Sequence, residues 1–158
     1  MKLPVLHELL VLLVLATSSA GAQTAPSVQD FTGKWRIAKV LGAADGGVSS
    51  TDPKNLLGKF VRWSEGEVQF PEQTCRLRGP SVSPVENQLL ETSIWGGQTI
   101  ADLELSKASL AKAFGRTTTP VFQDDSGCAN AVMLDHNHLV SGFSSGWIYR
   151  LDRVIPKR

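Results

Sequence analysis

The fold is decided by the stretch Asp30-Phe31-Thr32-Gly33-Lys34-Trp35-Arg36-Ile37-Ala38-Lys39-Val40. Within residues 34–41 the apolar side chains of Trp35, Ile37 and Leu41 lie at alternate positions, which predicts a β-strand with one buried face. Lys39 interrupts the alternation on the inward-facing side. We expect this strand to open a mainly β domain, to which the rest of the chain contributes the partner strands.

The Phe-x-Gly-x-Trp-Arg core of this stretch, residues 31–36, resembles the opening strand of lipocalin-like barrels. In that family a Trp early in the first strand closes one end of the barrel, and an Arg from the last strand lies across it. The resemblance implies a small antiparallel lipocalin-like barrel in which Trp35 is buried and structural. Arg153 has the same phase as the apolar residues of the last predicted strand, whereas Arg150 falls on the opposite face. We therefore expect Arg153 to stack on Trp35, a cation-π contact.

Residues 1–22 have the pattern of a removable signal peptide. Met1-Lys2 supplies a positive start, and Leu9–Ala16 is an apolar run too short to span a bilayer. The small residues Ala20-Gly21-Ala22 predict cleavage before Gln23; an uncleaved N-terminal anchor is the less favoured alternative. The sequence thus predicts a periplasmic or secreted protein without a stable membrane anchor.

The length and charge of the chain limit both the domain count and the partners. Residues 23–158 suffice for a single β-barrel domain with its own hydrophobic core. The 16 Lys and Arg residues nearly balance the 15 Asp and Glu residues. That balance argues against nucleic acid or an anionic membrane as the main partner, because both need a concentrated basic face.

Two cysteines, Cys75 and Cys128, are present in a chain that is predicted to reach an oxidising compartment. Pairing is the expected state there, so we predict one disulfide bond. Free thiols with a redox role are the alternative, but these usually occur as Cys-x-x-Cys.

The remaining segments predict a sheet of short strands. A hairpin is indicated by Lys59–Trp63 and Glu67–Phe70, joined by Ser64-Glu65-Gly66. Residues 79–84 contain two prolines and predict a break in the sheet, and Pro120 predicts that its strand lies at an edge. The other predicted strands are Thr74–Arg78, Thr117–Gln123, Cys128–Leu134, Leu139–Phe143 and Trp147–Val154.

Two helical segments are expected. Asp52–Gly58 reads as a single helical turn, with Asp52 as the N-cap, Pro53 at the first helical position and Gly58 as the stop. Ser106–Gly115 has a capping serine, apolar residues four apart and a terminal glycine, and it predicts the short helix of the domain.

Two motifs could carry chemistry. Gly142-Phe143-Ser144-Ser145-Gly146 matches a nucleophile elbow, but that motif requires a following helix and a downstream histidine, and the sequence offers neither. His136 and His138 are spaced as in some zinc sites, yet no third ligand has a distinguishing position. We interpret both motifs as turns, and we expect no catalytic residue, no metal and no cofactor.

The sequence therefore predicts an exported, non-catalytic, monomeric binding protein. Its partner is either a small apolar ligand held inside the barrel or a protein, in which case the chain is an inhibitor or accessory factor of the cell envelope. A cavity in the barrel would favour the ligand, whereas a filled core with exposed apolar residues would favour the protein partner. A small hydrolase using Ser144 or a His136/His138 metal site is the alternative in a different class, and a purely structural envelope protein is the third.

Overall fold

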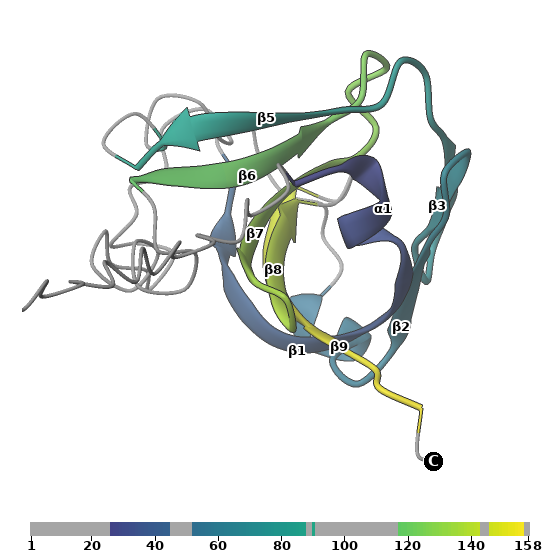
Figure 1. Ribbon diagram of the computed structural model, residues 1–158. Coiled ribbons are helices and arrows are strands. Elements are labelled where there is room, and N and C mark those ends of the chain that lie inside the picture. Colours follow the sequence, from purple (N-terminus) through teal and green to yellow (C-terminus); the bar gives the residue numbers. More distant parts are fainter. Residues whose placement is uncertain (1–25, 45–51, 88–89, 91–116, 143–145, 157–158) are drawn as a thin grey trace, which may run out of the picture.

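A computed structural model describes residues 26–44, 52–87, 90, 117–142 and 146–156 (Figure 1). The predicted signal peptide, residues 1–22, and the helix predicted at Ser106–Gly115 lie outside these residues. The described helices are α1 (Val28–Phe31) and the 3₁₀ turn η1 (Pro53–Leu56). The strands are β1 (Gly33–Ala43), β2 (Phe60–Trp63), β3 (Glu67–Gln69), β4 (Thr74–Arg76), β5 (Ser81–Glu86), β6 (Thr118–Gln123), β7 (Asn130–Asp135), β8 (His138–Gly142) and β9 (Trp147–Arg153).

All nine strands form one antiparallel sheet, in the order β4-β3-β2-β1-β9-β8-β7-β6-β5. Strands that follow one another in the chain are neighbours, except for β4 and β5, which are the two ends of the sheet. The sheet curls around α1 into a half-barrel (Figure 1). The predicted mainly β, antiparallel fold with one short helix is confirmed, although the described α-helix precedes the first strand.

β1 is the strand predicted from the opening stretch, with a change of phase in its middle. Trp35 and Ile37 point into the curl and are fully buried. The pairing with β9 shifts between Ile37 and Lys39, which marks a β-bulge. Beyond the bulge Val40 packs on the inner core, and Leu41 packs on the outer face instead. The prediction that Leu41 shares the face of Trp35 was therefore wrong, because a bulge reverses the alternation.

The predicted hairpin and helical turn are both present. β2 pairs with β3 through Arg62↔Gln69 and Trp63↔Val68. η1 begins as expected, because the Asp52 carboxylate accepts a hydrogen bond from the backbone N–H of Lys54 at 2.9 Å. Gly58, the predicted stop, has a φ of +80°, a conformation that glycine adopts without strain.

Two predictions that were based on prolines, both near the β5 end of the sheet, were wrong. Residues 81–86 form β5 rather than a break, and β6 lies inside the sheet rather than at its edge. Pro84 faces Pro120 across the two strands. Asn87 N–H bonds to Thr117 O in the same register three residues away, so the two prolines occupy a site at which antiparallel partners exchange no hydrogen bond. Both predictions were wrong, because the facing prolines cost the β5–β6 ladder no bond and because the pairing of β6 with β7 begins at Val121, beyond Pro120.

The interior of the half-barrel is filled by aromatic side chains from three elements. Phe31 of α1 lies 5.4 Å from Phe122 of β6 and 6.1 Å from Trp63 of β2, as measured between ring centroids. Trp63 meets Phe122 edge to face at 5.1 Å. Because β2 and β6 are not neighbours in the sheet, these three rings connect the two strands through the core.

The outer face of β6–β9 carries a second apolar layer. Val121, Val132, Val140 and Ile148 point away from the inner core and are buried. Leu90 packs on this face, against Val121 and Val132. Strands β6–β9 are therefore apolar on both faces, whereas the outer face of a simple barrel is exposed to solvent.

Candidate functional site

One end of the half-barrel is closed by Trp35 and Arg153. Trp35 is 0% exposed, and the guanidinium carbon of Arg153 lies 4.1 Å from the centroid of its ring. The indole Nε1 donates to Phe31 O at 2.9 Å, so its polar atom is satisfied. The arrangement is the one expected from the sequence, with Arg153 rather than Arg150 over the ring.

Arg153 also connects the segment before β1 with the last strand, β9. Its guanidinium donates to the carbonyl oxygens of Asp30 and Thr32, and its Nε donates to His136 O at 2.7 Å. Burial lowers the pKa of Arg153, and the nearby Asp30 opposes that shift. A planar guanidinium remains charged under such a shift and can serve three carbonyls at once. The cluster is a structural clamp.

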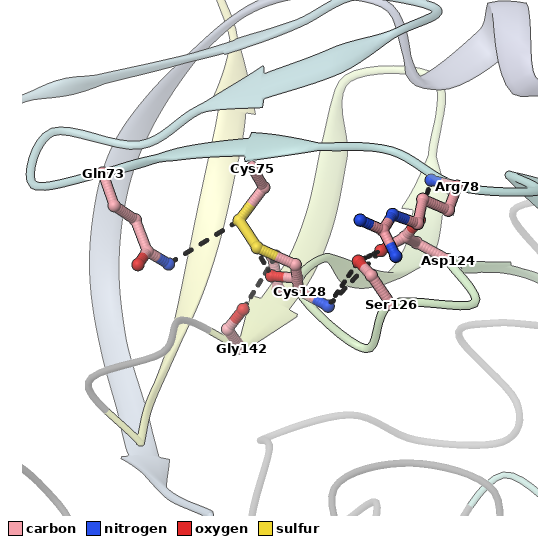
Figure 2. The surroundings of a disulfide bond; sticks show 8 residues. Gln73, Cys75, Arg78, Asp124, Ser126, Cys128 and Gly142 are labelled. Atoms are coloured by element: carbon pink, nitrogen blue, oxygen red, sulfur yellow. Dashed lines mark hydrogen bonds between the residues drawn. A yellow bond between two sulfur atoms is a disulfide. The ribbon is translucent and has the colours of Figure 1, made fainter.

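The open side of the half-barrel is bridged by the disulfide between Cys75 and Cys128, which confirms the predicted pairing (Figure 2). The Cα atoms are 5.8 Å apart, within the normal range for a disulfide. Cys75 belongs to β4, an end strand of the sheet, whereas Cys128 precedes β7 near the opposite end. The bond therefore spans the open side of the half-barrel.

Asp124 joins the same two regions through its carboxylate (Figure 2). It accepts hydrogen bonds from Arg78 N–H, from the Ser126 hydroxyl and from Cys128 N–H. Burial raises the pKa of Asp124, but these hydrogen bonds outweigh burial and hold the pKa below its usual range. Arg78 O in turn accepts from Asp125 N–H at 2.9 Å. The loop before β7 is thus fixed to the end of β4 by several bonds besides the disulfide.

The Arg153 cluster and the disulfide region define the shape of the site, but they do not identify a family. No family model matches the chain, and no curated protein or solved structure is significantly similar to it. Among the described residues, no helix is long and apolar enough to cross a membrane. The surfaces and the interior must therefore be interpreted from their own chemistry.

The predicted histidine turn lies between β7 and β8. His138 Nδ1 is 2.9 Å from the Asp135 carboxylate, and its Nε2 is 3.9 Å from Asp152 Oδ1. Burial raises the pKa of Asp135, yet hydrogen bonds from His138 and Asn137 hold it below the usual range. His136 is exposed, and within the described ranges no group of three potential ligands could hold a metal.

The serine motif is divided between described and undescribed residues. Ser144 and its neighbours 143 and 145 lie outside the described part of the chain, so its prediction as a turn residue stays a prediction. The neighbouring Ser141 is fully buried, and its hydroxyl donates to Asn130 O at 2.9 Å. Ser141 therefore serves to fix β8 to β7.

The sequence did not predict the surface outside β2, β1 and β9. Lys34 of β1 stands directly opposite Arg62 of β2, and both side chains are exposed. Next to them Phe60 is 44% exposed, with the Lys34 ammonium 3.8 Å from the centroid of its ring. The pairing register of β1 with β2 brings these residues together. The charged residues that alternate along each strand are a weak sequence signal for such a surface.

Asp152 of β9 is the acidic group of this surface. Its carboxylate lies 3.5 Å from Arg36 and 3.3 Å from Arg150. One carboxylate is therefore shared between two arginines, and neither Lys34 nor Arg62 has an ion-pair partner among the described residues. We call the surface formed by Lys34, Arg36, Phe60, Arg62, Arg150 and Asp152 the basic face.

Proposed function

We propose that this chain is an exported, non-catalytic binding protein whose partner is another protein, and that it serves as an inhibitor or accessory factor of the cell envelope. It acts as a monomer in the periplasm or outside the cell after loss of residues 1–22. The observation that carries the proposal is the filled interior. Phe31, Trp63 and Phe122 pack against one another where a carrier would hold its ligand.

The exposed apolar residues also support a protein partner. The large hydrophobic side chains that are exposed in the described part are Leu57, Phe60 and Ile155. Exposed apolar side chains that lie among polar groups are typical of surfaces that bind proteins. The disulfide fits an oxidising compartment, which supports export. Arg153 above Trp35 supports a lipocalin-like origin for the half-barrel.

A small apolar ligand is the second candidate, because one observation favours it. Trp63 is 3% exposed, and its Nε1 has no hydrogen-bond acceptor among the described residues. A buried N–H without an acceptor is unfavourable, and a ligand oxygen could satisfy it.

Native mass spectrometry of the exported protein distinguishes these candidates. We expect the mass of residues 23–158 with one disulfide and no bound small molecule. A stoichiometric small molecule that is lost on denaturation would replace our proposal with the carrier function.

Photo-crosslinking in the producing cells tests for the protein partner. p-Benzoylphenylalanine is placed in turn at Phe60, Glu72 and Arg76, which lie on different parts of the surface. A discrete adduct with another protein at one or more of these positions is expected. The absence of adducts at all of them would refute the proposal.

The hydrolase alternative has its own test. Ser144→Ala and His136→Ala are expected to leave the biological activity intact, because both residues are interpreted as turn residues. If either change abolished activity at an unchanged unfolding temperature, a small hydrolase would become the better explanation.

A further inference from the structure

The basic face has an excess of positive charge that the net charge of the chain conceals. The whole chain carries a net charge of +1. On the outside of β2, β1 and β9, however, the basic face holds four cationic side chains and one carboxylate, that of Asp152, which lies within ion-pair distance of Arg36 and Arg150 only. These three strands are adjacent in the sheet, with β1 in the middle (Figure 1). Cationic side chains therefore outnumber carboxylates within the basic face.

The pairing of β1 with β2 includes an unfavourable contact between like charges. Lys34 and Arg62 are directly opposite one another, and like charges at facing positions destabilise a sheet. Asp152 is already shared by Arg36 and Arg150, and neither Lys34 nor Arg62 has an ion-pair partner among the described residues. An acidic group from a partner would relieve this repulsion.

Apolar side chains lie within and beside the same face. Phe60 is directly opposite Arg36, and the Lys34 ammonium lies over its ring. Ile155 is 67% exposed and follows Val154, whose N–H donates to Lys34 O at 2.8 Å. Aromatic residues and arginines are the side chains that most often dominate protein–protein affinity.

We propose that the basic face binds an acidic segment of the partner protein. Carboxylates of that segment would pair with Lys34 and Arg62, and one of its apolar side chains would pack against Phe60. This inference rests on the proposed function and specifies the chemistry of its partner. A protein segment is favoured over a polyanion because the cations surround an exposed aromatic ring, and because a net charge of +1 gives little long-range attraction.

The test uses an array of short acidic peptides in which the position of one Leu, Phe or Trp varies, with Asn and Gln versions as neutral counterparts. The best peptide is labelled, and its affinity is measured by fluorescence anisotropy at about 0.15 M salt, where the Debye length is about 8 Å. We expect binding of acidic peptides and not of their neutral counterparts.

Two double variants with the same net charge locate the binding. Lys34→Gln/Arg62→Gln is expected to weaken peptide binding by about tenfold or more, and Phe60→Ser should weaken it similarly. Arg76→Gln/Arg78→Gln removes two exposed cations elsewhere, and the affinity should stay within about twofold of the wild type. The unfolding temperature of Lys34→Gln/Arg62→Gln should not fall, because a like-charge pair is removed.

Three results would overturn the inference. These are no binding of any acidic peptide, equal losses in the two double variants, or binding instead to phosphatidylcholine–phosphatidylglycerol vesicles that depends on Lys34 and Arg62. The last result would identify a membrane-docking face. If the peptide tests fail while cross-links form at Glu72 or Arg76, the proposed function stands and the location is wrong. If a small molecule is found and cross-links are absent, the function itself fails.

Discussion

Trp35 and Phe60 are aromatic residues of neighbouring strands with opposite roles. Trp35 is fully buried beneath Arg153, whereas Phe60 is partly exposed. Trp35→Ala should lower the free energy of unfolding by about 3 to 5 kcal/mol, as is typical when a large buried aromatic side chain is removed. Phe60→Ser should lower it by less, about 1 kcal/mol, because the ring is partly exposed but contacts the Lys34 ammonium. Urea denaturation of both variants checks the pair. Equal stability of Trp35→Ala and the wild type would show that the clamp is not structural.

Arg153 contributes through shape as well as charge. Arg153→Lys keeps the charge but cannot reach three carbonyl oxygens and the Trp35 ring together. We expect a loss of about 1 to 3 kcal/mol from the hydrogen bonds that lysine cannot replace. Chemical denaturation measures it, with Arg150→Lys on the outer face as the matched control, which should change stability little.

Asp124 makes stability depend on pH in a defined direction. Its pKa is below the usual range in the folded state, so its contribution is present above about pH 4 and is lost as the pH falls through the folded pKa. Asp124→Asn should be less stable than the wild type at neutral pH by about 1 to 3 kcal/mol. The difference should narrow below about pH 4.

Thermal unfolding as a function of pH checks this prediction. Asp125→Asn is the matched control, because the neighbouring carboxylate is exposed. A difference between Asp124→Asn and the wild type that stays constant as the pH is lowered until the native Asp124 is protonated would contradict it.

At the scale of the elements, β5 shows how a proline can protect a sheet edge. Pro84 faces Pro120 at a site without a cross-strand bond, so the missing N–H of Pro84 is on the side of β5 away from β6. An end strand without a donor at its centre is a poor template for another strand. Pro84→Thr should therefore increase self-association, as measured by light scattering of eluted fractions.

The neighbouring serine supplies the control for this prediction. Ser83→Thr also raises β-propensity, but its backbone N–H faces β6, so the variant should elute as the wild type does. Equal behaviour of Pro84→Thr and Ser83→Thr would show that the proline does not protect the edge.

The sequence predicted most elements whose signals are local. The N-cap of η1, the alternation in β2 and β3 and the phase of Arg153 each depend on residues close together in the chain. β5 was missed because the rule that excludes proline applies to central strands, and whether a strand is central depends on tertiary structure. The β1 bulge was missed because it exists only in the pairing with β9.

The basic face could not be predicted for a similar reason. Lys34 and Arg62 look like ordinary solvated charges on two separate strands. They become a like-charge pair only through the register of β1 with β2. The outer apolar layer had a readable signal, because Ala131–Leu134 is a continuous apolar run rather than an alternating one.

At the scale of the whole molecule, the disulfide holds together a sheet that hydrogen bonds leave open. It connects residues 53 apart in the chain, which corresponds to about 4 kcal/mol of stabilisation in the chain-entropy model. Cys75→Ala/Cys128→Ala should lower the free energy of unfolding by about 2 to 4 kcal/mol.

Urea denaturation of this double variant is compared with that of the wild type before and after reduction. The reduced wild type should match the variant, since both lack the cross-link. A variant as stable as the oxidised wild type would mean that the Asp124 hydrogen bonds alone close the open side.

The pairing of β1 with β9 makes closure of the sheet depend on its last strand. β1 is made first among the strands, yet one of its two neighbours, and the arginine that covers Trp35, come from the last strand. A nascent chain that still lacks β9 leaves one side of β1 unpaired, and such long-range closure is slow. The sheet can therefore close only after Arg153 has been synthesised, and a chain that stops before Arg153 leaves Trp35 without its covering guanidinium.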